Sequence, residues 1–162
     1  MAEKPLTGAS PKATEYLLNT QSEFTSASRA LEGLTPAQAM MKPKNCPHSV
    51  AEIVTHMLFW QTQVLNSIQG KPVQEVSSAA MGWQKVSERD WDRIHDEFLA
   101  GLELSLDMAR DAELLGRVNR TNQTVGFRLL SHAEHDAYHL GQIVLIRRMI
   151  GAWPPPGGGD TW

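Results

Sequence analysis

The sequence has little that would mark a secreted, membrane-bound or nucleic-acid-binding protein. Cys46 is the only cysteine in 162 residues, so no disulfide can form within the chain, which suits a reducing compartment. No apolar run approaches membrane-spanning length, and residues 1–16 lack the apolar core of a signal peptide. The net charge of −3 leaves no basic excess for contacting phosphates. We therefore expect a cytoplasmic protein that binds neither membranes nor nucleic acid.

What is present is an ordinary globular composition, with 41% hydrophobic and 20% charged residues. A chain of this length is long enough to bury a core and is typical of one domain. We expect residues 1–162 to form that single domain.

Apolar residues recur at helical spacing in four segments, which predicts helices over 12–31, 49–68, 87–108 and 124–150. The apolar positions of the first segment are Tyr16, Leu17, Phe24, Ala27 and Leu31. The second segment opens with Ser49 and Glu52 at the spacing of a capping box, and Thr35-Pro36 predicts a short helix before it. Residues 70–87 show no clear period and form a connection too long for adjacent antiparallel helices. The pattern predicts an all-α four-helix bundle with a long crossover between helices 2 and 3.

The fourth segment carries a stripe that is apolar at both ends and polar in the middle. Positions 125, 129, 132, 136, 139, 143, 146 and 150 lie on one helix face, and His132, Asp136 and His139 occupy its centre. Burying imidazole or carboxylate groups without partners costs about 1–3 kcal/mol each. The helix therefore needs something that compensates these groups.

A metal ion would compensate them. His135 and His139 are four residues apart, about 6 Å in rise, so their imidazoles can share one ion. His132 and His139 are seven residues apart, about 10.5 Å in rise, which is too far for one straight helix to supply all three ligands. A third ligand must then come from another helix.

The remaining histidines offer two candidates for that ligand. His56 lies inside the second helix and can face the interior, His95 lies one position off the apolar face of the third, and we expect His48 to be solvated. Without a metal, the histidines would hydrogen-bond to Asp136 or to backbone carbonyls. The spacing excludes neither reading.

Two segments resemble conserved signatures of one family. Residues 135–143, HDAYHLGQI, and 49–60, SVAEIVTHMLFW, resemble motifs of the DinB-like superfamily. Residues 31–38, LEGLTPAQ, and 151–162, GAWPPPGGGDTW, are similar to one branch of that superfamily. The resemblance implies a four-helix bundle of up-down-down-up order with a long crossover.

The same resemblance implies a divalent ion, nickel or zinc, whose metal ligands here are His56, His135 and His139. His132 is not a ligand position by this match, and we expect it beside the ligands or on the substrate side. Asp136 is expected to orient one imidazole.

Three neutral imidazoles leave a coordination position open, which is typical of catalytic sites. Such an ion lowers the pKa of bound water toward about 7 or deprotonates a coordinated thiol. The resemblance implies the second course: a metal-dependent thiol S-transferase in which a low-molecular-weight thiol attacks a small-molecule substrate. The alternatives are a metal-dependent hydrolase, or a non-catalytic, damage-inducible stress protein that binds metal and acts through dimerisation. The resemblance also implies a homodimer.

No side chain stands out as a nucleophile. We interpret Cys46 as a bystander in its loop. Gln142 is expected near the site, whereas Tyr138 and Arg147 should project away from it, toward the surface or an interface.

Aromatic residues add two further expectations. Trp60 and Trp91 are candidates for walls of the pocket, although such residues are usually core. Trp153 and Trp162 either order the tail, residues 151–162, against the bundle or lie at a dimer interface.

Overall fold

The computed structural model describes residues 10–19, 25–119 and 122–158, so Phe24 and Trp162 lie outside the described residues. Most of the described chain is helical and none of it forms a strand beyond one isolated bridge, which confirms the all-α prediction. Within these same ranges, no helix combines the length and the apolar character needed to cross a membrane.

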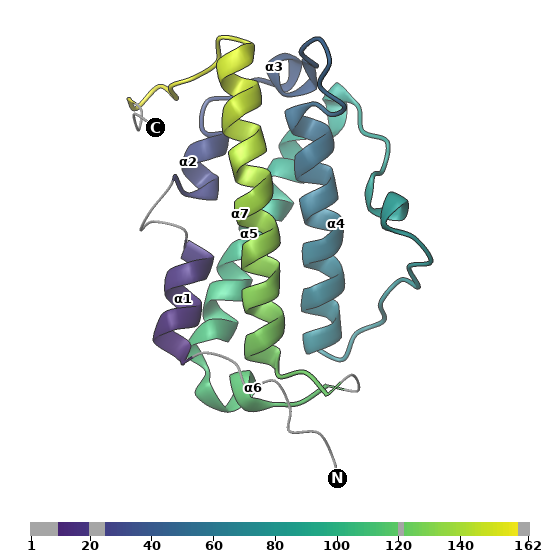
Figure 1. Cartoon of the computed structure of the whole chain (residues 1–162), viewed down its shortest axis with the longest axis vertical. Helices are drawn as coiled ribbons and strands as arrows, with labels where there is room; N and C mark the ends of the chain where they lie inside the picture. The colour runs from purple at the N-terminus through teal and green to yellow at the C-terminus, as the bar shows by residue number, and fades with distance from the viewer. Residues whose placement is uncertain (1–9, 20–24, 120–121, 159–162) are drawn as a thin grey trace.

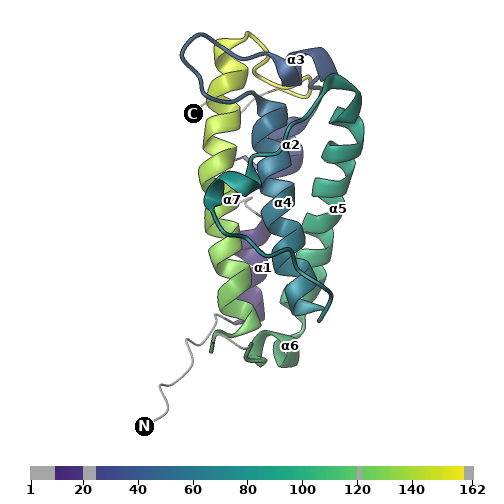
Figure 2. The ribbon, with the colours of Figure 1, turned by 90° about the vertical axis from the view of Figure 1, so that its right-hand side faces the viewer.

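Three long helices dominate the molecule (Figure 1): α4 (Val50–Ile68), α5 (Trp91–Arg110) and α7 (Val125–Met149). Shorter elements are α1 (Pro11–Asn19), α2 (Ala27–Leu31), α3 (Pro36–Met40), α6 (Ala112–Gly116) and the 3₁₀ turns η1 (Ala79–Gly82) and η2 (Glu88–Asp90). Helix α4 packs against α5 and α7, and α1 packs against the same two helices. The connection from α4 to α5 crosses the outside of α4, where η1 lies against that helix (Figure 2).

The predicted ends of the long helices are confirmed where capping residues set them. The Ser49 hydroxyl accepts a hydrogen bond from the Glu52 N–H, and the Glu52 carboxylate accepts one from the Ser49 N–H at 2.7 Å. Thr35 and Gln38 form the same capping box at α3. The Thr124 hydroxyl caps α7 by accepting from the backbone of Phe127. Each cap satisfies N–H groups that the first turn leaves without partners.

The prediction of one continuous helix over 12–31 is wrong. Ser26 has an extended backbone and caps a separate helix, α2, by accepting a hydrogen bond from the Arg29 N–H. A side chain that satisfies this N–H begins a new helix, so the chain is not helical across this position.

The predicted apolar face of the first segment is confirmed at Ala27 and Leu31 but wrong at Tyr16 and Leu17. Tyr16 and Leu17 are exposed, whereas Thr14 and Leu18, one turn apart, are the buried positions. The Thr14 hydroxyl is satisfied by donating to the Ser10 carbonyl, so a polar side chain takes an interior position that apolar spacing would assign elsewhere.

Two further boundaries differ from the prediction. Helix α5 begins at Trp91 rather than at residue 87, because residues 88–90 form the 3₁₀ turn η2. The polar stretch before α7 contains helix α6, which buries Leu115.

The interior consists of two apolar clusters stacked along the long axis. The upper cluster includes Met57, Phe98 and Ile143, and the lower cluster includes Leu65 and Leu129. Between them, α7 contributes buried polar side chains, His132, Asp136 and His139. The stripe that was apolar at both ends and polar in the middle therefore corresponds to two cores separated by a polar layer.

Arg147 does not lie at the surface as predicted. Its side chain is 1% exposed, and its guanidinium donates to the backbone carbonyls of Ala30, Glu32 and Ala152. The same guanidinium lies over the ring of Trp153, 5.4 Å from its centre. Arg147 therefore joins the end of α2 to the beginning of the tail. Trp153 packs against the bundle, which is the first of the two positions expected for it.

Candidate metal centre

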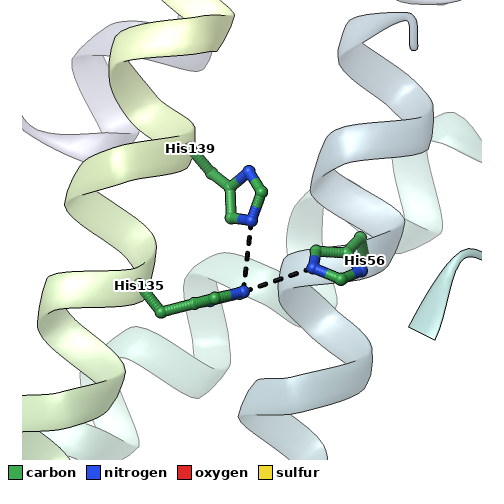
Figure 3. A group of neighbouring side chains, drawn as sticks. All are labelled: His56, His135 and His139. Atoms are coloured by element: carbon green, nitrogen blue, oxygen red, sulfur yellow. Dashed lines mark hydrogen bonds between the residues drawn. The ribbon is translucent and has the colours of Figure 1, made fainter. Parts of the chain in front are cut away.

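Three histidines meet between α4 and α7, His56 from α4 and His135 and His139 from the middle of α7 (Figure 3). The Nε2 atom of His135 lies 3.2 Å from that of His56 and 3.1 Å from that of His139. Of the two candidates for a third partner, His56 joins the pair on α7. His95 belongs to neither of the two histidine-containing clusters found among the described residues; it bonds to Asp96 instead.

Polar contacts on the far side of two of the rings indicate which nitrogen faces the centre as an acceptor. His139 Nδ1 lies 2.7 Å from the side-chain oxygen of Gln142, so Nδ1 carries the hydrogen and Nε2 keeps its lone pair. His135 Nδ1 faces a carboxylate oxygen of Asp136 at 3.5 Å, which favours the same tautomer. The lone pairs of His135 and His139 therefore face each other at the centre, an unfavourable arrangement unless a cation lies between them.

The spacing of the three nitrogens fits such a cation. A tetrahedral zinc ion with Zn–N distances of about 2.0–2.1 Å places two ligand nitrogens roughly 3.3 Å apart. The separations of 3.1 and 3.2 Å are close to that value. Imidazole ligands suit zinc and nickel equally well. The residues present therefore fit a divalent metal with three protein ligands.

Burial keeps the imidazoles of His56 and His139 neutral and able to coordinate. Burial, together with the neighbouring His139 and His135, lowers the pKa of His56 to about 4. Burial also lowers the pKa of His139, an effect that the hydrogen bond to Gln142 partly opposes. At neutral pH, neither ring must lose a proton before it can bind a metal.

Asp136 is a buried carboxylate behind the metal ligands. Its side chain lies 3.3 Å from His132 Nε2 and 3.5 Å from His135 Nδ1, yet neither oxygen has a hydrogen bond of good geometry. A carboxylate in this position orients a metal-binding imidazole and increases its basicity. Burial lowers the pKa of His132, and the Asp136 charge opposes that shift. His132 thus lies beside the three-histidine group rather than in it.

A comparison with protein-family models identifies the family. The model described as the DinB superfamily matches residues 20–143, a range that includes all three histidines. The chain belongs to the DinB superfamily. No curated protein and no solved structure gave a match. The family membership that the two motifs predicted is therefore confirmed.

In this DinB superfamily protein, the connection between α4 and α5 covers the histidine group. Trp83 stacks on His56 with ring centres 4.0 Å apart, and on the opposite side it stacks on His48 at 3.6 Å. His48 is therefore half-buried, with 33% of its side chain exposed, so the expectation that it is solvated is only partly confirmed. Sequence reasoning missed Trp83 because its segment has no period; a glycine–tryptophan pair in a polar stretch was the available signal.

Gly82 allows this cover to approach closely. A Cβ atom at this position would lie 2.7 Å from Trp60 Nε1 and 2.9 Å from His56 Nδ1. Both distances are shorter than van der Waals contact allows. Any larger residue must displace the tryptophan, the histidine or the covering segment.

The two tryptophans expected at the pocket have different positions. Trp60 presents its ring edge-on to His56, with centres 6.3 Å apart, and so belongs to the site. Trp91 is in the upper apolar cluster, where its Nε1–H donates to the Leu34 carbonyl.

The remaining predictions concern single polar side chains. Gln142 contacts His139, as expected. Tyr138 is 67% exposed, but its ring lies edge-on to that of His139 with centres 5.1 Å apart, so the expectation that it points away from the site is only partly confirmed. Cys46 contacts Met149 at 3.8 Å and packs against the upper cluster.

Proposed function

We propose that this protein binds one divalent ion, nickel or zinc, through His56, His135 and His139, and that it is a metal-dependent thiol S-transferase. The observation that carries the proposal is the convergence of three imidazole Nε2 atoms in a buried polar layer. A bound divalent ion supplies Lewis acidity there, lowering the pKa of a coordinated thiol so that a thiolate is present at neutral pH.

The environment of the three rings supports a small-molecule substrate. His56 and His139 are buried, whereas the side chain of His135 is 30% exposed. A cavity of about 230 Å³ between α4 and α7 borders that exposed ring. The ring of Trp83 stacks on that of His56 and so covers this histidine. A ligand would therefore approach on the His135 side, where the ring leaves room.

The position of the one cysteine supports a separate thiol. Cys46 packs against the upper apolar cluster and contacts Met149 rather than the histidines. The nucleophile must therefore be a bound molecule. A low-molecular-weight thiol is the nucleophile we propose, and water would be its competitor.

We also propose that residues 1–162 form one domain, a four-helix bundle of up-down-down-up order. In it, α1 and α2 together act as the first helix and residues 69–87 act as the crossover. The packing of α1 and α4 against both α5 and α7 supports this arrangement.

A homodimer completes the proposal. Tyr138, Leu145 and Met149 are large apolar side chains on α7, and each is more than half exposed. Their spacing of seven and four residues places them on one face of that helix. We propose this face of α7 as the contact between two copies.

Metal content, measured by mass spectrometry on untagged protein, tests the site. We expect about one equivalent of zinc or nickel in the wild type and a large loss in His56→Ala and His139→Ala. His95→Ala is the matched control and should retain the metal. Metal-free wild-type protein that also fails to bind after reconstitution would refute the site.

Product analysis tests the reaction. Metal-loaded protein, a thiol and an alkyl halide should give a thioether, as the sulfur displaces the halide and its proton passes to solvent. The rate should fall to background in the metal-free protein and return on adding the metal. Turnover of an ester without thiol would indicate a hydrolase instead. One bound equivalent without either reaction would indicate a non-catalytic metal-binding protein.

A further inference from the structure

The cavity beside His135 continues along α7, away from the histidines. Trp60 on α4 and Phe127 on α7 line it, and so do His135 and Arg128. Since Arg128 and His135 are seven residues apart on one helix, the cavity spans about 10.5 Å along the helix axis. It therefore joins the exposed histidine to an arginine about two turns away.

A second, larger cavity of about 710 Å³ shares Arg128 and Gln123 with the first. It lies where the end of α4 meets the beginning of α7 (Figure 1), and Lys71 and Arg117 line it. Three cationic side chains thus face one region. Among the described residues, no aspartate or glutamate lines either cavity.

Arg128 has hydrogen-bond donors to spare. It is half-buried, it donates to the Ser67 hydroxyl, and burial lowers its pKa. A guanidinium has five N–H donors, so this one bond leaves most of them for a ligand. Across the described part of the chain, no carboxylate forms an ion pair with Arg128. Arg29, Arg93 and Arg110, by contrast, each pair with a carboxylate.

Arg117 is positioned beside Arg128 by the backbone. Its Nη2 atom donates to the Ile68 carbonyl at 3.1 Å, at the last residue of α4. This bond holds an exposed guanidinium at the mouth of the larger cavity. A half-buried arginine, a second arginine and a lysine without a nearby acid attract an anion.

We propose that the two cavities form one channel for an elongated substrate that carries an anionic group. The reacting end of the substrate lies beside His135, and its carboxylate or phosphate is bound by Arg128 with help from Arg117 and Lys71. The rings of Trp60 and Phe127 face the apolar part between the two ends. The reacting end rests on the proposed function, whereas the anion subsite at Arg128 does not depend on a metal.

Calorimetric titration with three probes that lack a thiol tests the anion subsite alone. Hexanoate and hexyl phosphate should both bind more tightly than hexanol, with or without zinc, and the tighter of the two shows which anion the site prefers. Arg128→Gln should weaken binding of the preferred anion about tenfold or more, since charged hydrogen bonds are lost. Arg117→Gln, at an exposed position, should weaken it less and cannot upset the core. Arg89→Gln, an exposed arginine in η2, is the control and should bind as the wild type does.

Thiol probes then connect the subsite to the metal. Mercaptohexanol should bind only to zinc-loaded protein, and mercaptohexanoate should bind more tightly still, with the difference lost in Arg128→Gln. If the anions bind through Arg128 but zinc does not improve thiol binding, the proposed thiol chemistry is refuted and the anion subsite is supported. If hexanoate and hexyl phosphate bind no better than hexanol, or if Arg128→Gln and Arg117→Gln both match the wild type, the anion subsite is refuted.

Discussion

Asp136→Asn should weaken metal binding without weakening the metal-free fold. The Asp136 side chain is 3% exposed, and both of its oxygens lack hydrogen bonds. One oxygen lies 3.5 Å from Nδ1 of His135, the ring whose Nε2 faces the other two histidines. In the metal-free protein this charge is buried at a cost. With a divalent ion on the other side of the ring, the same charge stabilises both the Nδ1–H group and the ion.

The size of the effect follows from this geometry. Loss of a carboxylate that supports a metal-binding histidine typically costs 10–100-fold in metal affinity, or about 1.4–2.8 kcal/mol. Asparagine has nearly the same volume, so no cavity forms. Its amide N–H can donate to His132 while its oxygen accepts from the His135 Nδ1–H, whereas a carboxylate can only accept. The stability of the metal-free protein should therefore stay the same or rise.

Two assays on the same preparations test the expected loss of zinc affinity and the expected unchanged or higher stability of the metal-free protein. Competition with a chromogenic chelator gives the zinc affinity, and urea unfolding of the metal-free protein gives its stability. Asp92→Asn, on the exposed face of α5, is the control and should change neither value. Wild-type zinc affinity in Asp136→Asn would refute the role we assign to the carboxylate. A loss of stability greater than about 2 kcal/mol in the metal-free variant would instead make Asp136 a structural partner of the buried histidines.

Three further predictions concern close packing and protonation. Gly82→Ala should lower zinc affinity in the same chelator assay, because its Cβ would displace His56 or the covering segment; unchanged affinity would contradict the tight cover. Gly101→Ala should destabilise the fold by about 1–3 kcal/mol in urea, because its Cβ would lie 1.9 Å from the side-chain oxygen of the buried Gln61. Gly141→Ala, a helical glycine with open space around it, should instead stabilise by up to about 1 kcal/mol, and equal effects would refute the contrast. The pKa of His56 falls from 6.5 to about 4 on folding, so between these pH values the unfolded chain binds more protons than the folded one. The metal-free protein should therefore lose stability as the pH falls from 7 to 5. Equal stability at both pH values would contradict the pKa shift.

The parts of the fold that the sequence predicted well depend on local signals. The capping box of Ser49 and Glu52 and the long apolar stripes of α4 and α7 involve residues within one or two turns of each other. The prediction of one helix over 12–31 was wrong for a related reason. Apolar spacing continues across Ser26, so periodicity cannot distinguish one long helix from two separate helices.

In the candidate site, too, spacing alone predicted the residues that lie close together in the sequence and not those far apart. His135 and His139 are visible in the sequence because they are one turn apart on one helix. His56 lies 79 residues from His135 along the chain, so spacing could only nominate it beside His95. Trp83 was not predicted at all, because an aperiodic segment gains its structure from the rings it covers and not from its own pattern.

The two arginines at opposite ends of α7 show why residue type alone does not reveal a binding site. Both are at least half-buried, and burial lowers the pKa of each. Arg147 donates to three backbone carbonyls, which would be left without partners if it turned toward a ligand. Arg128 donates to one hydroxyl and faces a cavity lined by two more cations. The acceptors around each guanidinium, which only the folded chain defines, therefore make the first a structural residue and the second the residue that we expect to contact substrate.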